Sequence, residues 1–234
     1  MRRCTQGFTL VEIAVVLVII GLLLGGILQG QQLIQSARVQ NLADQQAGVR
    51  AAYYGFIDRY GAVPGDMPRD AARDALGDSA IARGGPGQGR LPAPGGDGWD
   101  ALNGVWEHLS VAGFISGHYQ GAATTAPTSA DEAPVNAFQG LVLLAHHDGY
   151  LDDDGRTPDR LLYHFGGNVP ASVARELDDK LDDGRPGSGT VRNAAPGQQM
   201  WESDAACVRP ARTGDHTVWD VELDAPDCNP VFLF

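Results

Sequence analysis

The sequence predicts an α+β fold, in which one long N-terminal helix packs on a C-terminal head containing an antiparallel β-sheet. The first observation is that no proline occurs between Met1 and Val63. The second is a set of short runs rich in branched and aromatic residues, separated by glycine- and proline-rich turns. The third is that only a few segments of the second half have a helical spacing of apolar residues.

The N-terminal part of the predicted helix is suited to a membrane. From Phe8 to Leu28 the only ionisable side chain is Glu12. About 20 apolar residues in a helix span about 30 Å, the thickness of the hydrocarbon core. Arg2 and Arg3 precede the run, and such positive flanks stay in the cytoplasm. We therefore expect a single membrane span, with the rest of the chain on the outer side.

Glu12 is the feature that a simple membrane anchor does not explain. A carboxylate near the membrane centre costs about 2.5–3.5 kcal/mol and usually marks a function. A secretory signal peptide has a shorter apolar core followed by a small-x-small cleavage site, and this run lacks both features. Cleavage between Gly7 and Phe8 would create an amino group one helical turn before Glu12. That amine could reach its own Glu12 or pair with Glu12 of a neighbouring chain.

The hexapeptide GFTLVE at residues 7–12, followed by the apolar run, resembles the N-terminal signature of type IV prepilins and type II secretion pseudopilins. The resemblance implies cleavage after Gly7 by a prepilin peptidase and N-methylation of Phe8 by the same enzyme. It also implies that Glu12 guides the addition of subunits to a helical filament. Cys4 would leave with the leader peptide, so that an even pair of cysteines remains.

The run departs from many type IV pilins, which carry a proline in the second half of this helix. Here Gly21, Gly25, Gly26 and Gly30 stand instead. Glycine weakens a helix by about 1 kcal/mol relative to alanine, and its spacing here also permits close helix approach. Simple tolerance of glycine in a membrane helix is an equal alternative. The missing proline favours a pseudopilin or a minor pilin.

Beyond the membrane the helix is expected to continue with one apolar face. The stripe ends before Gly61 and Pro64, which predict the end of the helix. The expected domains are a leader at 1–7, a membrane or filament-core helix at 8–29, an amphipathic continuation at 30–60 and a head at 61–234. The residues of the stripe are Leu33, Ala37, Leu42, Val49, Tyr53 and Phe56.

The head is expected to contain short elements between irregular loops, and pilin-like proteins resemble this layout of a helical spine with a sheet. Residues 65–104 predict a loop with one short helix at 69–76. The other expected elements are a helix in 105–117 ending at Gly113 or Gly117, an exposed loop at 120–134, a buried apolar run in 136–151, a strand in 159–167, a helix from Pro170 to Gly184, and strands at 216–223 and 230–234.

Cys207 and Cys228 are expected to form a disulfide, because disulfides persist outside the cytoplasm. A loop of this size gains about 3 kcal/mol from such a bond. The pair resembles the C-terminal disulfide of many type IV pilins. Two free buried thiols are the alternative.

Two acidic segments are candidates for a cation site. Carboxylates at the end of the helix in 170–184 oppose the helix dipole, which is easier to understand with a cation or an arginine nearby. Oxygen ligands of this kind suit Ca²⁺, and some pseudopilins hold calcium in the head. A solvated acidic face is the alternative. The segments contribute Asp178, Asp179, Asp182 and Asp183, and Asp152, Asp153 and Asp154.

No enzymatic motif stands out. His146 and His147 are adjacent and would point to opposite sides of a strand, which argues against joint metal ligation. Ser188 lies in GSGT, which is not a nucleophile elbow, and no phosphate-binding loop is present. The net charge of −12 argues against a nucleic-acid partner.

We therefore expect a structural subunit of a type IV pilus or a type II secretion pseudopilus. Its expected partners are other subunits, the prepilin peptidase, the inner-membrane assembly platform and membrane lipid. The expected location is the inner membrane with a periplasmic head, followed by the filament. The alternative function is a periplasmic binding or enzymatic domain that uses a simple N-terminal anchor.

Overall fold

The computed structural model describes residues 10–120, 124–195 and 203–234 of the chain. The chain divides into two units, Met1–Arg38 and Val39–Phe234. The predicted cleavage site at Gly7 and Phe8 lies outside the described residues. The long helix α1, Leu10–Tyr60, contributes residues to both units.

Helix α1 ends where the sequence predicts. Gly61 follows it with a φ of 65°, and the Gly61 amide donates to the Ile57 carbonyl at 2.8 Å. The predicted apolar stripe is only partly correct, because burial begins at Val39. Leu33 belongs to the first unit and is 69% exposed there. Ala37 is exposed as well. The residues of α1 that are buried in the second unit are Val39, Leu42, Ala43, Gln46, Val49, Ala52, Tyr53 and Phe56.

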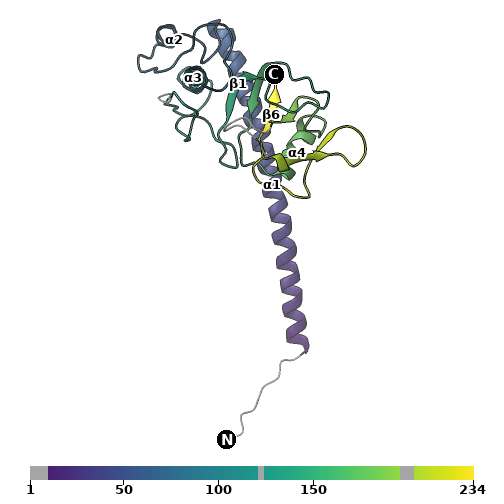
Figure 1. The fold of residues 1–234 in the computed structure, drawn as a ribbon. Coiled ribbons are helices and arrows are strands. Elements are labelled where there is room, and N and C mark those ends of the chain that lie inside the picture. Colours follow the sequence, from purple (N-terminus) through teal and green to yellow (C-terminus); the bar gives the residue numbers. More distant parts are fainter. Residues whose placement is uncertain (1–9, 121–123, 196–202) are drawn as a thin grey trace. The chain divides into compact units, whose positions relative to one another are not determined.

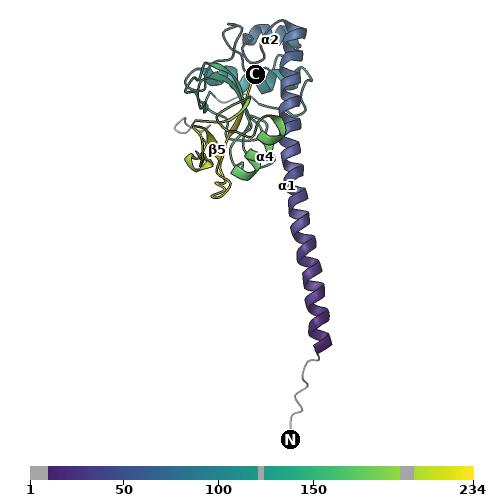
Figure 2. The same ribbon diagram turned by 90° about the vertical axis from the view of Figure 1, so that its right-hand side faces the viewer.

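The head contains a four-stranded antiparallel sheet with the order β1-β2-β6-β3. Its strands are β1 (Leu143–His147), β2 (Arg160–His164), β3 (Val191–Asn193) and β6 (Pro230–Leu233). The sheet and helix α4 lie along the residues of α1 from Val39 onward, within the second unit (Figures 1 and 2). One row of side chains across the strands joins the core that α1 covers: Leu144, Tyr163, Phe232 and Val191.

Both edge strands of this sheet already use backbone groups for contacts with loops. At the β1 edge the His146 amide donates to the Pro92 carbonyl at 3.2 Å. At the β3 edge the Leu151 amide donates to the Asn193 carbonyl at 2.9 Å. Since β1 and β3 are the outer strands, these loops occupy part of each edge.

The short helix at 69–76 is confirmed as α2, Arg69–Leu76. The helix predicted in 105–117 is α3, which spans Gly98–Val111 and therefore begins earlier than expected. Gly104 lies inside α3 at a close approach to the loop before it, because a Cβ there would lie 3.1 Å from the Arg83 Cβ. The glycine that made residues 98–104 look like a loop instead permits a close contact. Gly113 follows α3 with a φ of 77°, as predicted for its end.

The predicted helix after Pro170 is α4, Ala171–Leu181, with Val173 and Leu177 buried. A second sheet pairs β4 (Val208–Pro210) with β5 (Thr217–Trp219), and a 3₁₀ turn at Ala205–Cys207 precedes it. The strand predicted at 216–223 is too long. The chain turns after Trp219, because the Asp220 carboxylate accepts the amides of Glu222 and Leu223. Strands β3 and β4 were not predicted from the sequence.

The loop predicted at 120–134 contains no helix or strand in its described residues, 120 and 124–134. It is less exposed than expected, since Ala126 and Ala133 are buried.

Candidate functional site

The apolar part of α1 is the first candidate site. Its large side chains are exposed from Leu10 to Ile34, and α1 is long and apolar enough to cross a membrane. Such a surface needs an apolar environment or a protein partner to cover it. A Cβ at Gly21, Gly25 or Gly26 would meet no atom within 4 Å. Close approach by another helix is therefore unobstructed on these positions.

Glu12 lies in the first turn of α1 and is exposed. The carboxylate stands at the positive end of the helix dipole, which stabilises a negative charge by about 0.3–1 kcal/mol at an exposed site. This contribution is smaller than the cost of placing a carboxylate in the membrane. A positive charge on a neighbouring chain would stabilise a membrane-embedded Glu12 further.

The acidic segment at the end of α4 forms the second candidate site. Ligand oxygens of Asp178, Asp182 and Asp183 lie within 4.8 Å of one another. Asp179 instead lies 3.5 Å from Arg175 in an ion pair one turn earlier. The structure thus brings together three of the four aspartates predicted here.

Asp178 is the buried member of this cluster. The Trp219 indole donates to its Oδ2 at 2.8 Å and the Gly184 amide to its Oδ1 at 3.2 Å. The pKa of Asp178 is raised to about 7, mainly by burial and in addition by the charges of Asp183 and Asp182, although the two hydrogen bonds lower it. A bound cation would favour the ionised carboxylate here.

The exposed members of the cluster bind the turn that follows α4. Asp182 Oδ2 accepts the amides of Thr190 and Val191. Asp183 accepts the Ser188 hydroxyl at 2.6 Å and the Arg185 amide at 3.0 Å. These bonds order the glycine-rich turn without a metal. Calcium at this cluster therefore remains a prediction.

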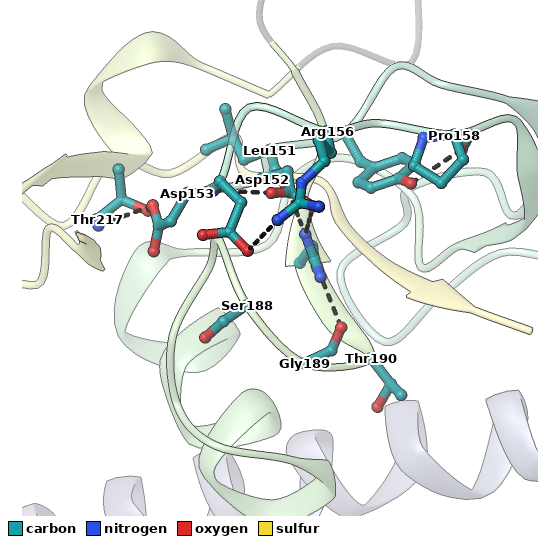
Figure 3. A network of polar contacts seen from close by, with 12 residues as sticks. Leu151, Asp152, Asp153, Arg156, Pro158, Ser188, Gly189, Thr190 and Thr217 are labelled. Carbon is teal, nitrogen blue, oxygen red and sulfur yellow. Dashed lines mark hydrogen bonds and ion pairs between the residues drawn. The ribbon is translucent and has the colours of Figure 1, made fainter. Parts of the chain in front are cut away.

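The second acidic segment is a polar network between loops and strands (Figure 3). Asp152 pairs with Arg192 at 2.7 Å, and both side chains are largely buried. Burial alone would raise the pKa of Asp152, but the hydrogen bond and charge of Arg192, together with the amides of Asp154 and Arg156, lower it. Asp153 accepts the amide and hydroxyl of Thr217 at 3.0 and 2.8 Å. Arginine and threonine thus explain these acidic residues structurally.

The six histidines do not gather in one place, but two of them meet. His147 Nε2 lies 2.7 Å from His164 Nε2. His146 lies on the other side of β1, as its position in the strand predicts, and contributes to a hollow with Tyr53 and Tyr54 of α1. The contact between His147 and His164 was missed, because it depends on the pairing of β1 with β2.

The predicted disulfide joins Cys207 to Cys228, and both residues are fully buried. It connects the end of the 3₁₀ turn to the segment that leads into β6. The Cys228 amide and carbonyl also pair with Val169, just before α4. The bond therefore ties the β4–β5 hairpin to the main sheet.

The comparisons with known proteins concern the N-terminus of the chain. The family model of the prokaryotic N-terminal methylation motif matches residues 2–28. This match and the long apolar helix are consistent with a type IV pilin-like protein and support membrane anchoring. Neither the curated proteins nor the solved structures contain a match to the chain.

Proposed function

We propose that the chain is a structural subunit, a minor pilin or a pseudopilin, of a type IV pilus or a type II secretion pseudopilus. The observation that carries this proposal is the methylation motif at residues 2–28, which includes the apolar first part of helix α1 with its exposed side chains. A helix of this kind has two uses in such a protein. It holds the precursor in the membrane, and it packs against the helices of neighbouring subunits in a filament.

Processing creates a positive charge that can pair with Glu12 of a neighbouring subunit. Prepilin peptidase cuts between Gly7 and Phe8 and methylates the new amino group of Phe8. A secondary amine of this kind stays protonated at neutral pH, so it offers one positive charge to one carboxylate. Glu12 of a neighbouring subunit meets this charge as the two helices align. The pair offsets the cost of a carboxylate in an apolar environment.

The head is proposed to lie in the periplasm and then on the filament surface. The Cys207–Cys228 disulfide supports this location, because disulfides persist in oxidising compartments. Arg2 and Arg3 support the same orientation through the positive-inside rule. The proposed partners are other subunits, the prepilin peptidase, the inner-membrane assembly platform and membrane lipid. No catalytic role is proposed for the head.

Mass spectrometry of the protein purified from membranes tests the proposal. The expected mature chain begins at an N-methylated Phe8, whereas a simple anchored domain keeps residues 1–7. Retention of these residues in functional protein would exclude the proposal.

Assembly is tested separately with Glu12→Gln, which removes the charge but keeps the side-chain length. The expected result is normal cleavage and a loss of co-assembly with neighbouring subunits. Asp58→Asn serves as the matched control, because Asp58 is an exposed acid of α1 outside the apolar segment. Normal assembly of Glu12→Gln would contradict the pairing of Glu12 with an amine.

A further inference from the structure

The buried contact between two imidazoles in the head has no role in the proposed assembly. His147 lies at the end of β1 and His164 at the end of β2. Ala145 of β1 pairs with Leu162 of β2. His147 follows Ala145 by two residues, and His164 follows Leu162 by two residues in the opposite direction along the sheet. Both side chains therefore lie on the same face of the sheet and reach toward each other.

The geometry of this contact requires a single shared proton. The two Nε2 atoms lie 2.7 Å apart, which is a hydrogen-bond distance and leaves no room for a hydrogen on each. The rings are nearly parallel, with an angle of 16° between their planes. The two lone-pair directions thus point at each other, and one nitrogen donates while the other accepts.

Neighbouring groups decide which imidazole donates. The Gly149 amide donates to His147 Nδ1 at 3.0 Å, so this nitrogen carries no proton. Neutral His147 therefore carries its proton on Nε2 and donates to His164. Neutral His164 then carries its proton on Nδ1, which faces the side-chain amide of Asn229 at 3.3 Å. A half-turn of this amide presents its oxygen as the acceptor.

From this arrangement we propose that the His147–His164 pair is an acid-operated latch: the neutral pair ties the end of β1 to β2, and the doubly protonated pair releases it. The first added proton must occupy His147 Nδ1, which breaks the bond from Gly149. A second proton would put a hydrogen on both Nε2 atoms. It would break the bond between the imidazoles and place two positive charges against each other.

The surroundings of the pair favour its neutral form. His164 is fully buried and His147 is half-buried, so a proton from solvent reaches the pair through His147. Burial lowers the pKa of both histidines. The carboxylates of Asp148 and Asp159 raise the pKa of His147, whereas His146 lowers it. Asn229 raises the pKa of His164 without adding a charge.

The sign of the pH dependence follows from these shifts. Below about pH 6.5, histidines in the unfolded chain take up protons that the folded pair does not hold. The stability of the head is therefore highest above this pH and falls as the solution becomes more acidic. Each proton that only the unfolded state binds raises the unfolding equilibrium constant by up to about tenfold per pH unit.

Denaturant unfolding of the full-length chain in detergent micelles tests the latch at pH 7.5 and pH 5.5. Tryptophan fluorescence reports on the head, where Trp106 and Trp219 are buried. The chains to compare are wild type, His147→Gln, His164→Gln and the double variant. His118→Gln is the matched control, since His118 is an exposed histidine of the head.

The double-mutant cycle gives the decisive result. We expect favourable coupling between positions 147 and 164 at pH 7.5, where the neutral imidazoles share a hydrogen bond. The loss of unfolding free energy between pH 7.5 and pH 5.5 should be smaller in the double variant than in wild type. In the His118→Gln control this loss should be the same as in wild type. Absence of coupling at pH 7.5, or an unchanged acid sensitivity of the double variant, overturns the proposal.

A second measurement uses only the wild-type chain and so does not depend on the folding of the variants. Hydrogen exchange of the Gly149 amide, corrected for its intrinsic pH dependence, should lose at least tenfold protection between pH 7.5 and pH 5.5. Amides in the middle of α3 serve as the internal reference and should keep their protection. Constant protection of Gly149 across this range overturns the latch.

Discussion

Single side chains hold the irregular part of the head by accepting hydrogen bonds from its backbone. The Glu107 carboxylate accepts the amides of Ala82 and Arg83 at 2.9 and 3.0 Å. His108 accepts the Gly65 amide at 2.9 Å in the same way. Buried backbone groups without a regular partner need such acceptors. Some acidic residues, which the composition alone would assign to the surface, therefore stabilise loops inside the fold by accepting their backbone amides.

Glycine at position 65 is required on two grounds, and this leads to a prediction. Gly65 has a φ of 83°, and a Cβ there would lie 2.3 Å from the Ala101 carbonyl oxygen. Gly65→Ala should therefore lower the free energy of unfolding by more than the roughly 1–2 kcal/mol of left-handed backbone strain alone. Thermal or denaturant unfolding of the two chains measures the difference.

Gly77 supplies the matched control for this prediction. It has a φ of 71° at the end of α2, but a Cβ there would meet no atom within 4 Å. Gly77→Ala should therefore cost only the strain, about 1–2 kcal/mol. Equal losses for the two variants would show that the contact with α3 is not tight.

At the scale of elements, the sequence predicts the helices and strands whose residue pattern lies within the element itself. Helices α1, α2 and α4 and strands β2 and β6 follow from apolar spacing and from glycine or proline at their ends. Strands β3 and β4 are three residues each and owe their conformation to partners far along the chain. The start of α3 was missed because Gly98 and Gly104 serve packing there, which composition does not reveal.

The candidate sites also differ in whether their residues are close together in the sequence. The motif around Glu12 is contiguous, so it was found from the sequence. The contact between His147 and His164 requires the register of two strands, which the sequence does not give. Within the acidic cluster, Asp178 and Asp182 are one helical turn apart and share a side of the chain. Asp179 and Asp183 have the same spacing, so the sequence alone does not show that Asp179 pairs with Arg175 and lies outside the cluster.

The calcium prediction belongs to the end of α4. A cation at Asp178, Asp182 and Asp183 should raise the unfolding midpoint, because a ligand that binds only the folded state stabilises it. The test compares the midpoint at pH 8 in millimolar calcium with that in chelator. Asp182→Asn should remove the calcium effect, whereas Asp179→Asn should keep it because Asp179 pairs with Arg175. Identical midpoints in calcium and chelator would rule the site out.

At the scale of the whole molecule, the disulfide limits the freedom of the unfolded chain. Replacing Cys207 and Cys228 together by serine should lower the free energy of unfolding by about 3 kcal/mol. The expected loss of stability concerns the head, because both cysteines belong to the second unit, Val39–Phe234. Denaturant unfolding of the double variant measures it, with reduced and oxidised wild type as the reference. A loss below about 1 kcal/mol would mean that the hairpin is held by packing alone.

The loops at Pro92 and Leu151 have a consequence for crowded assemblies of this protein. Exposed strand edges invite pairing between chains, which leads to aggregation. Here a strand from another chain would first have to displace the backbone hydrogen bonds that β1 and β3 already make with loops of their own chain. At high local density, pairing of copies through the edges of the four-stranded sheet is therefore hindered.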